Sequence, residues 1–199
     1  TATATVAATV VKTATIAQTL TPLSPTATPI SIQSQGITQV TTVSANAASV
    51  GRYLKFEATF QINRTFPAGS MLPYYFYDPS DAQGINGISI DGHFIAPSGR
   101  QMVVPAFYYQ DYTRSGTTQE VMTTNNTYAW KLRFAPDEIG NYTYYITVTD
   151  KSGTSQYPAA GSLSFQSTAS TSKGFLRVSP RDSRFMEFSN GESFVPVSA

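Results

Sequence analysis

The acidic residues are the first candidates for chemistry in this sequence, because two carboxyl groups that face one cleft can hydrolyse a glycosidic bond. The chain has twelve of them: Glu57, Asp78, Asp81, Asp91, Asp111, Glu120, Asp137, Glu138, Asp150, Asp182, Glu187 and Glu192. Most fall at expected turns or strand ends, and none forms a convincing pair. Asp137 and Glu138 follow Pro136 in an expected loop, where a solvated turn is the simpler interpretation. We therefore expect no catalytic residues and a protein that is not an enzyme.

Other chemistries have little support from the residue types present. Asp78, Asp81 and Asp91 could gather around a calcium ion, which takes oxygen ligands, but the spacing of an EF-hand loop is absent. His93 is the only histidine and there is no cysteine, so a Ser-His-Asp triad, a zinc site and a disulfide framework are not expected. The sequence also lacks a glycine-rich phosphate-binding loop. We expect no bound metal and no cofactor.

Aromatic side chains give a better argument for binding. One aromatic run covers residues 74–77, another covers residues 107–109, and Tyr112 follows the second. Consecutive residues of a strand face opposite sides, so alternate rings should be exposed. Exposed tyrosines could stack on sugar rings beside Gln110 and Asp111; the alternative is that they pack under loops or at a protein interface. The candidate contact residues are Tyr74, Tyr108 and Tyr112.

β-Structure must position these side chains, because short apolar and aromatic runs recur between Gly, Pro, Asn and Asp residues from about residue 30 onward. The expected strands span residues 36–44, 52–62, 71–77, 88–96, 101–109, 128–135, 141–149, 161–167, 174–178 and 184–188. Trp130 shares its face with Leu132 and Phe134 and is expected in the core. The spacing of strands and turns predicts an all-β two-sheet sandwich with a C-terminal hairpin.

The strand at 141–149 carries a further signature. Its alternate residues Tyr142, Tyr144, Ile146 and Val148 share one face. The run resembles the tyrosine-corner strand of immunoglobulin-like domains, in which a Tyr near the strand start bonds back to nearby backbone.

The first twenty residues differ from the rest of the chain. They alternate between threonine and apolar residues, and Lys12 is the only charge before Arg52, so they read as one long half-buried strand. Three prolines then predict an extended linker at 21–35, before a sandwich at 36–170 and an extension at 171–199. An apolar face needs a surface to cover, and we expect Val6, Val10, Ile16 and Leu20 to fill pockets in a neighbouring chain.

Composition narrows the partners and the location. The formal net charge is +1 and only 13% of the residues are charged. Lysine and arginine form no cluster in the sequence, so we do not expect nucleic acid as a partner. The apolar runs fall well short of the roughly 18 residues of a membrane span. The abundance of hydroxyl and amide side chains favours an extracellular or cell-surface protein. Sequons at Asn63, Asn125 and Asn141 would be glycosylated in a host that uses them.

Three stretches together resemble a known family: the aromatic segment at 107–112, the segment WKLRFAPDEIGNYTYYITVTDKSG at 130–153 and the segment KGFLRVSPRDSRFMEFSNGESFVPV at 173–197. They are similar to the immunoglobulin-like module of unassigned function that precedes the (β/α)₈ barrel in many secreted bacterial glycoside hydrolases. The resemblance covers residues from about 50 to 197 and implies a module without the carboxylates of the barrel. It does not account for residues 1–29.

Two functions remain open, and both are non-catalytic. In the first, the N-terminal strand completes the sheet of another copy, head to tail, and builds an extracellular filament. In the second, the chain is a carbohydrate-binding or spacer module of a secreted glycoside hydrolase, with polysaccharide as its partner.

Overall fold

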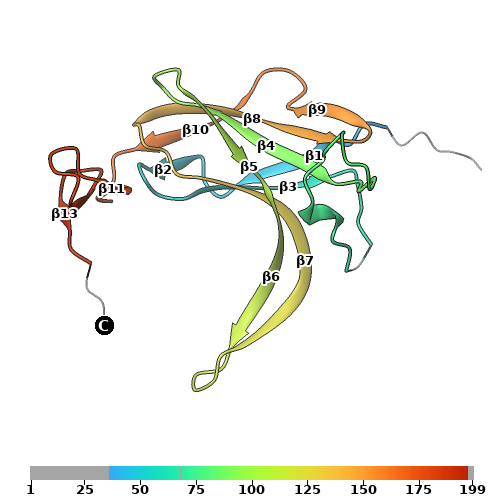
Figure 1. Ribbon diagram of the computed structural model, residues 1–199, viewed down its shortest axis with the longest axis horizontal. Coiled ribbons are helices and arrows are strands. Elements are labelled where there is room, and N and C mark those ends of the chain that lie inside the picture. Colours follow the sequence, from blue (N-terminus) through green and yellow to red (C-terminus); the bar gives the residue numbers. More distant parts are fainter. Residues whose placement is uncertain (1–35, 68, 197–199) are drawn as a thin grey trace, which may run out of the picture. The chain divides into compact units, whose positions relative to one another are not determined.

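The computed structural model describes residues 36–67 and 69–196, so the expected arm at 1–20 and the expected linker at 21–35 lie outside the described residues. The described part is built from β-strands arranged in three sheets (Figure 1). Two of the sheets form a sandwich, which confirms the expected all-β sandwich. No helix within these residues is long and apolar enough to cross a membrane.

The first sheet has four antiparallel strands in the order β1-β3-β7-β6. Their bounds are β1 (Val40–Ala45), β3 (Phe56–Ile62), β6 (Phe107–Ser115) and β7 (Val121–Phe134). The second sheet has the order β2-β10-β8-β4-β5, and β9 also pairs with β8. Its strands are β2 (Ser49–Gly51), β4 (Ile88–Ile95), β5 (Gln101–Pro105), β8 (Gly140–Asp150), β9 (Gly153–Tyr157) and β10 (Leu163–Thr168). Only the β2–β10 pair of this sheet is parallel.

A third, small sheet follows the sandwich. It consists of β11 (Leu176–Val178), β12 (Met186–Phe188) and β13 (Ser193–Phe194), all antiparallel. β12 and β13 form the C-terminal hairpin that the Ser-Asn-Gly sequence at 189–191 predicts. Glu187 lies buried on β12, where Arg177, Arg181 and Ser179 bond its carboxylate.

The core lies between the first two sheets, where every second residue of a strand is buried. β4 and β8 alternate buried and half-buried residues along nearly their whole length, as their sequences predict. Trp130 is 3% exposed and Leu132 is fully buried, which confirms the expected core face of β7. Aromatic rings fill much of the space: Phe56 stacks on Phe165 across the two sheets with their ring centres 4.0 Å apart.

The expected tyrosine corner is present at the start of β8. The hydroxyl of Tyr142 accepts a hydrogen bond from the backbone N–H of Glu138 at 3.0 Å and donates one to Asp137 at 3.1 Å. Arg100 also pairs with Asp137, so this turn is held by side chains and is more than a solvated loop. These hydrogen bonds tie the loop between β7 and β8 to the first residues of β8.

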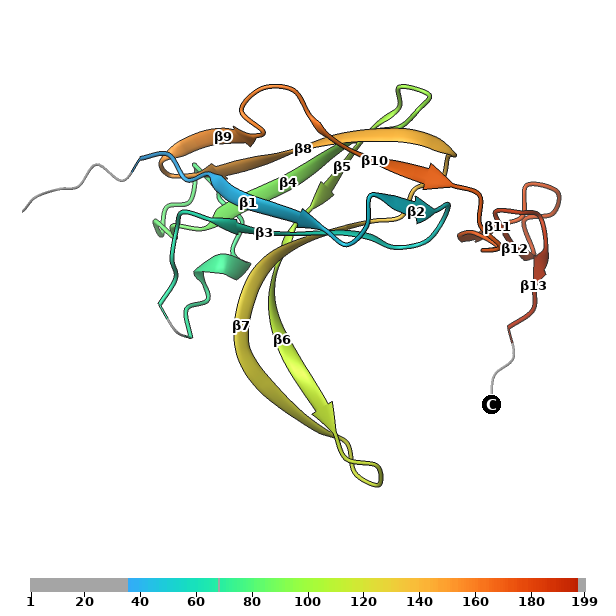
Figure 2. The same ribbon diagram turned by 180° about the vertical axis from the view of Figure 1, so that it is seen from behind.

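The chain passes from the second sheet to the first between β5 and β6. The N–H of Ala106 still bonds Ile90 of the second sheet at 2.8 Å, and the next residue already belongs to β6. β6 and β7 then run together beyond the sandwich as a long, bent hairpin (Figures 1 and 2). A register shift between Gln110 and Tyr112 accompanies the bend, since a bulge increases local twist.

The structure corrects the expected strand at 71–77. A single 3₁₀ turn at Leu72–Tyr74 and an irregular loop occupy this segment. Pro73 explains the difference, because proline fixes φ and cannot donate to a strand ladder. The structure also starts β7 at Val121, although the sequence predicted a strand only from residue 128.

Candidate functional site

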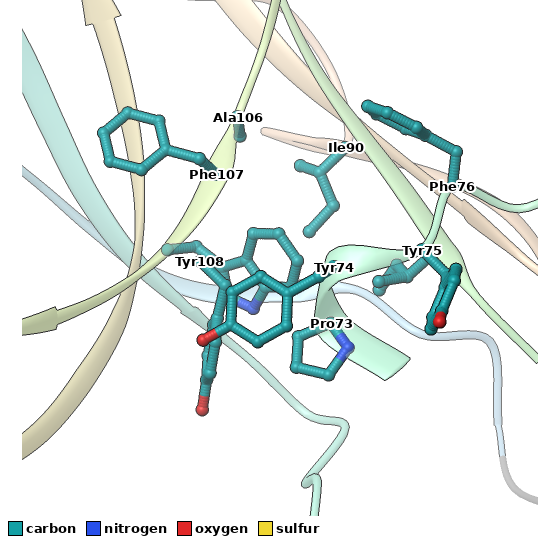
Figure 3. A pocket seen from close by; sticks show the side chains of 10 residues that line it. Pro73, Tyr74, Tyr75, Phe76, Ile90, Ala106, Phe107 and Tyr108 are labelled. Atoms are coloured by element: carbon teal, nitrogen blue, oxygen red, sulfur yellow. The ribbon is translucent and has the colours of Figure 1, made fainter. Parts of the chain in front are cut away.

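Two of the three expected contact tyrosines lie together beside the hairpin. Tyr74 from the 3₁₀ turn meets Tyr108 of β6 edge to face, with ring centres 5.9 Å apart. Tyr108 in turn stacks on Tyr128 of β7 at 5.6 Å and lies 5.2 Å from Trp130. Figure 3 shows the rings of Tyr74 and Tyr108 next to each other, with Pro73 close by. We call the surface formed by Tyr74, Tyr108 and Tyr128 the aromatic groove.

Strand register explains how the sequence builds this surface. Tyr108 is paired with Trp130, and Tyr128 precedes Trp130 by two residues, so these rings share one face of the β6–β7 hairpin. Trp130 is buried at the inner end of this face, whereas Tyr128 is 40% exposed beyond the edge of the core. The groove therefore continues the aromatic core of the sandwich out into solvent.

The loop that carries Tyr74 does not behave as the expected strand. Tyr74, Tyr75 and Phe76 are 52%, 46% and 70% exposed, so three consecutive rings reach solvent where alternation was expected. Only Tyr74 belongs to the 3₁₀ turn, and Tyr75 and Phe76 follow it in an irregular loop. Because none of the three residues lies in a strand, no sheet imposes an alternation between two faces.

Two hollows adjoin at the aromatic groove and share Pro73, Tyr74 and Tyr108. One, of about 150 Å³, lies between the segment at 73–76 and the start of β6, and Ile90 and Trp130 also line it. The other, of about 400 Å³, is lined by residues from the loop at 66–71 and by Tyr74, Tyr108, Gln110 and Tyr128. The two hollows are lined mainly by aromatic side chains with a few hydroxyl and amide groups. This lining is typical of a site for an uncharged polar ligand.

The described lining of the two hollows contains no carboxylate, histidine, lysine or arginine. Burial raises the pKa of the Tyr108 hydroxyl, and the neighbouring Tyr74 and Tyr128 raise it further, so Tyr108 stays protonated at neutral pH. The groove can therefore stack on a ligand and donate hydrogen bonds to it.

Tyr112, the third expected contact residue, does not join the groove. It lies beyond the register shift, opposite Thr124, and makes no ring contact with another described residue. Its hydroxyl bonds Gln110 at 3.2 Å. Asp111, expected to help bind sugar, accepts hydrogen bonds from the Tyr109 hydroxyl and the Asn125 amide and fastens the two strands of the hairpin to each other.

Tyr128 is the groove residue that the sequence did not single out. It stands alone, without an aromatic run around it, and the expected strand began only at its own position. The available signal was its spacing of two residues from Trp130, which places both rings on the same face of a strand.

Two of the three aspartates considered as calcium ligands make hydrogen bonds within their own loop. Asp78 accepts a hydrogen bond from the N–H of Ser80, and Asp81 accepts hydrogen bonds from the N–H groups of Gln83 and Ile85. Such contacts stabilise tight turns. Within residues 36–67 and 69–196, no three or more Asp, Glu or His side chains lie where they could hold a metal ion.

The three sequon asparagines are exposed but differ in their contacts. Asn63 bonds the backbone of Ile37 and Gln39 through its amide, and the Asn125 amide bonds Asp111. Asn141 lies on β8 opposite Gln166. Glycosylation at these positions stays a prediction, as does strand donation by Val6, Val10, Ile16 and Leu20, which lie outside the described residues.

Comparison with known proteins identifies the family. The model of a domain of unknown function, DUF5060, matches residues 49–149, which is just over half of the 199 residues. The chain belongs to the DUF5060 family. The DUF5060 match runs from β2 into β8 and includes all three tyrosines of the aromatic groove. Neither the curated proteins nor the solved structures contain a match to this chain.

Proposed function

We propose that this DUF5060 chain is a non-catalytic, extracellular carbohydrate-binding module. The proposal rests on the aromatic groove, in which the rings of Tyr74, Tyr108 and Tyr128 line adjoining hollows. None of the described residues that line these hollows is charged. A pyranose ring has apolar C–H faces and polar edges. The C–H faces pack on aromatic rings, and the hydroxyl edges bond groups such as the tyrosine hydroxyls and Gln110.

The size of the groove fits a short stretch of polysaccharide. The two hollows, of about 150 and 400 Å³, adjoin through shared residues, so neighbouring sugar units can occupy them in succession. The ring of Tyr108 contacts Tyr74, Tyr128 and Trp130, so it loses little conformational freedom when a ligand binds. This arrangement favours a polymeric ligand held by several weak contacts.

The resemblance to the immunoglobulin-like module that precedes glycoside hydrolase barrels supports the same proposal. In such a protein, the module would keep the catalytic domain close to insoluble or polymeric substrate by raising its effective concentration. The abundance of hydroxyl and amide side chains supports a secreted location.

Affinity electrophoresis and pull-down on a panel of neutral polysaccharides test the proposal. Tyr74→Ala and Tyr108→Ala should each weaken binding about five- to tenfold, because a stacked ring contributes on the order of 1 kcal/mol. Phe185→Ala is the matched control, since Phe185 is 61% exposed on the segment before β12 and lines neither hollow. The proposal fails if no polysaccharide is retained, or if the tyrosine variants bind as well as the control.

The exposed edge of β6 favours a second candidate, assembly into a filament. β6 pairs with β7 on one side, and its other edge has no strand partner among the described residues. Such an edge accepts an added strand through backbone hydrogen bonds. The period-two sequence of residues 1–20, with Val6, Val10, Ile16 and Leu20 on one face, would supply that strand from another copy.

Deletion of residues 1–20 tests this candidate. The truncated chain should remain a folded monomer under conditions in which the full chain forms polymers, as measured by light scattering and electron microscopy. A full chain that stays monomeric, or a truncated chain that still polymerises, would rule out assembly by strand donation.

A further inference from the structure

A second hollow site lies away from the aromatic groove, where the end of β7 meets the start of β3. It has a volume of about 300 Å³ and is lined by Tyr53, Lys55, Arg133, Phe134 and Ala135. Arg133 and Lys55 are the cationic residues of this lining, and no carboxylate is among its described residues. We call it the cationic hollow.

Positive charge is in excess around the cationic hollow. Lys55, Lys131 and Arg133 all approach one carboxylate, that of Glu57, at 3.5, 3.0 and 2.5 Å. One negative charge therefore faces three positive ones. Arg52 adds a fourth cation nearby, with its guanidinium carbon 4.9 Å from the centre of the Tyr53 ring.

Arg133 is well placed to bind an anion. Only its Nε bonds Glu57, and its two terminal nitrogens have no hydrogen-bond partner within the part of the chain that the structure describes. Its orientation is nevertheless fixed, because the guanidinium lies 4.9 Å from the centre of the Phe107 ring. A planar guanidinium with free donors matches the two oxygens of a carboxylate or a sulfate.

Tyr53 forms a rigid wall of this hollow at a cost in backbone strain. Its φ is 67°, a left-handed conformation that non-glycine residues rarely adopt. Its N–H bonds the carbonyl of Pro136 at 2.6 Å, and its ring packs against Phe175 with ring centres 5.2 Å apart. Strain of this kind persists where surrounding structure fixes it, and such positions are concentrated at ligand sites.

We propose that the cationic hollow is a subsite for an acidic sugar unit, so that the module selects anionic polysaccharides. The carboxylate or sulfate group of the sugar pairs with Arg133 and Lys55, and the sugar ring lies against Tyr53. The inference rests on the proposed carbohydrate-binding function and adds the chemical class of the ligand.

Binding of the full chain to dextran, dextran sulfate, polygalacturonate and polyglutamate tests the proposal at about 0.15 M salt, where surface charges are partly screened. Dextran and dextran sulfate share a backbone and differ in the sulfate groups, polygalacturonate supplies carboxylates, and polyglutamate is a polyanion without sugar. At least one of the two acidic polysaccharides should bind tenfold or more tightly than dextran and polyglutamate. If polyglutamate binds as tightly as the acidic polysaccharides, the site attracts any polyanion and does not recognise sugar, which would overturn the proposal.

Arg133→Gln should abolish this preference for acidic sugar, and Lys55→Gln should reduce it severalfold. Lys55 is 58% exposed in its side chain, so its replacement tests the site even if Arg133→Gln impairs folding. Arg184→Gln is the control, because it removes an arginine that also pairs with a carboxylate but is 81% exposed and lies near β12, outside the lining of the cationic hollow. The proposal is wrong if the control reduces acidic binding as much as Arg133→Gln and Lys55→Gln do.

Tyr108→Ala separates this inference from the function on which it rests. If Tyr108→Ala weakens all polysaccharides while Arg133→Gln changes none of them, the groove binds sugar and the cationic hollow does not. If Arg133→Gln removes acidic binding and Tyr108→Ala has no effect, the groove proposal fails and the cationic hollow is the binding site.

Discussion

Glu57 is a nearly buried carboxylate held by cations from a neighbouring strand. It is 11% exposed in its side chain, and β7 supplies both Lys131 and Arg133 as partners. Burial opposes ionisation of Glu57, but the hydrogen bonds and charges of Arg133 and Lys131 prevail and lower its pKa from 4.5 to about 2. Glu57 therefore keeps its negative charge at any pH at which the protein is expected to work.

Acid titration should reveal this coupling. Because the folded pKa lies below the unfolded one, Glu57 stabilises the fold fully above about pH 4.5, and this stabilisation is lost as the pH falls toward 2. The free energy of unfolding of the Glu57→Gln variant, measured with urea between pH 7 and pH 2, should fall less steeply than that of the unmodified chain. Glu120→Gln, at an exposed position beside the hairpin turn, should keep the original slope; equal slopes for all three proteins would contradict the role of Glu57.

The sequence indicates which aromatic residues are candidates for the site better than it indicates which of their rings lie together. Tyr74 and Tyr108 stand out because they lie in aromatic runs, and the structure brings them together. Tyr128 was not singled out, and Tyr112 lies outside the groove because a register shift between Gln110 and Tyr112 changes which residues of β6 and β7 face each other. No local pattern in the sequence marks that shift.

Among the elements, β4 and β7 pack across the core through a glycine that lies against a leucine side chain. Gly92 of β4 faces the buried side chain of Leu132 of β7, and a Cβ added at Gly92 would lie only 2.7 Å from Cδ1 of Leu132 and nearer still to Cδ2. Real Cβ atoms do not tolerate such distances, so any side chain at this position must displace its neighbour. Glycine here sets the local spacing of the two sheets.

Gly92→Ala should therefore destabilise the sandwich by about 1–3 kcal/mol through overpacking. Leu132→Ala alone should cost about 2–5 kcal/mol, because it opens a cavity. The double variant should be less destabilised than the sum of the two, since the new methyl group enters the space that Leu132 leaves. Urea unfolding of the four proteins measures this interaction, and strict additivity would show that the two residues do not compete for the same space.

The same strands show how far sequence predicts the elements. β4 and β8 were expected almost to their observed ends because they bury one face, and burial imposes strict alternation. The outer half of the β6–β7 hairpin is exposed on both faces, so its sequence carries no such pattern, and β7 extends seven residues further than its predicted start at 128. The segment at 71–77 is rich in aromatic residues yet forms no strand, because Pro73 and the lack of a pairing partner prevail over β-propensity.

At the scale of the whole described chain, one polar network joins three distant segments. Thr38, just before β1, donates its hydroxyl to Asp150 at the end of β8 at 2.6 Å. Arg64, after β3, bonds the same carboxylate oxygen at 2.9 Å, and the backbone N–H and hydroxyl of Ser152 bond the other oxygen. Burial of Asp150 would raise its pKa, but the bonds from Ser152 and Thr38 and the charge of Arg64 lower it, so the carboxylate stays ionised. This network fastens both sheets at one end of the sandwich.

Asp150→Ala should be one of the most damaging single changes in the sandwich. Asp150 is 4% exposed and the Arg64 side chain is 13% exposed, so the substitution leaves a nearly buried cation without its counter-charge, which typically costs about 3–5 kcal/mol. Asp182→Ala is the control, because it also removes an arginine-paired aspartate, but from the exposed loop between β11 and β12, and should change the stability little.

A double variant separates the loss of the ion pair from the loss of packing. Arg64→Met together with Asp150→Ala should be clearly less destabilised than the sum of the single variants, because the second substitution removes the uncompensated charge. Thermal and urea unfolding provide both comparisons. If Asp150→Ala proved no worse than Asp182→Ala, the tie between Thr38, Arg64 and Asp150 would contribute nothing measurable to the stability of the sandwich.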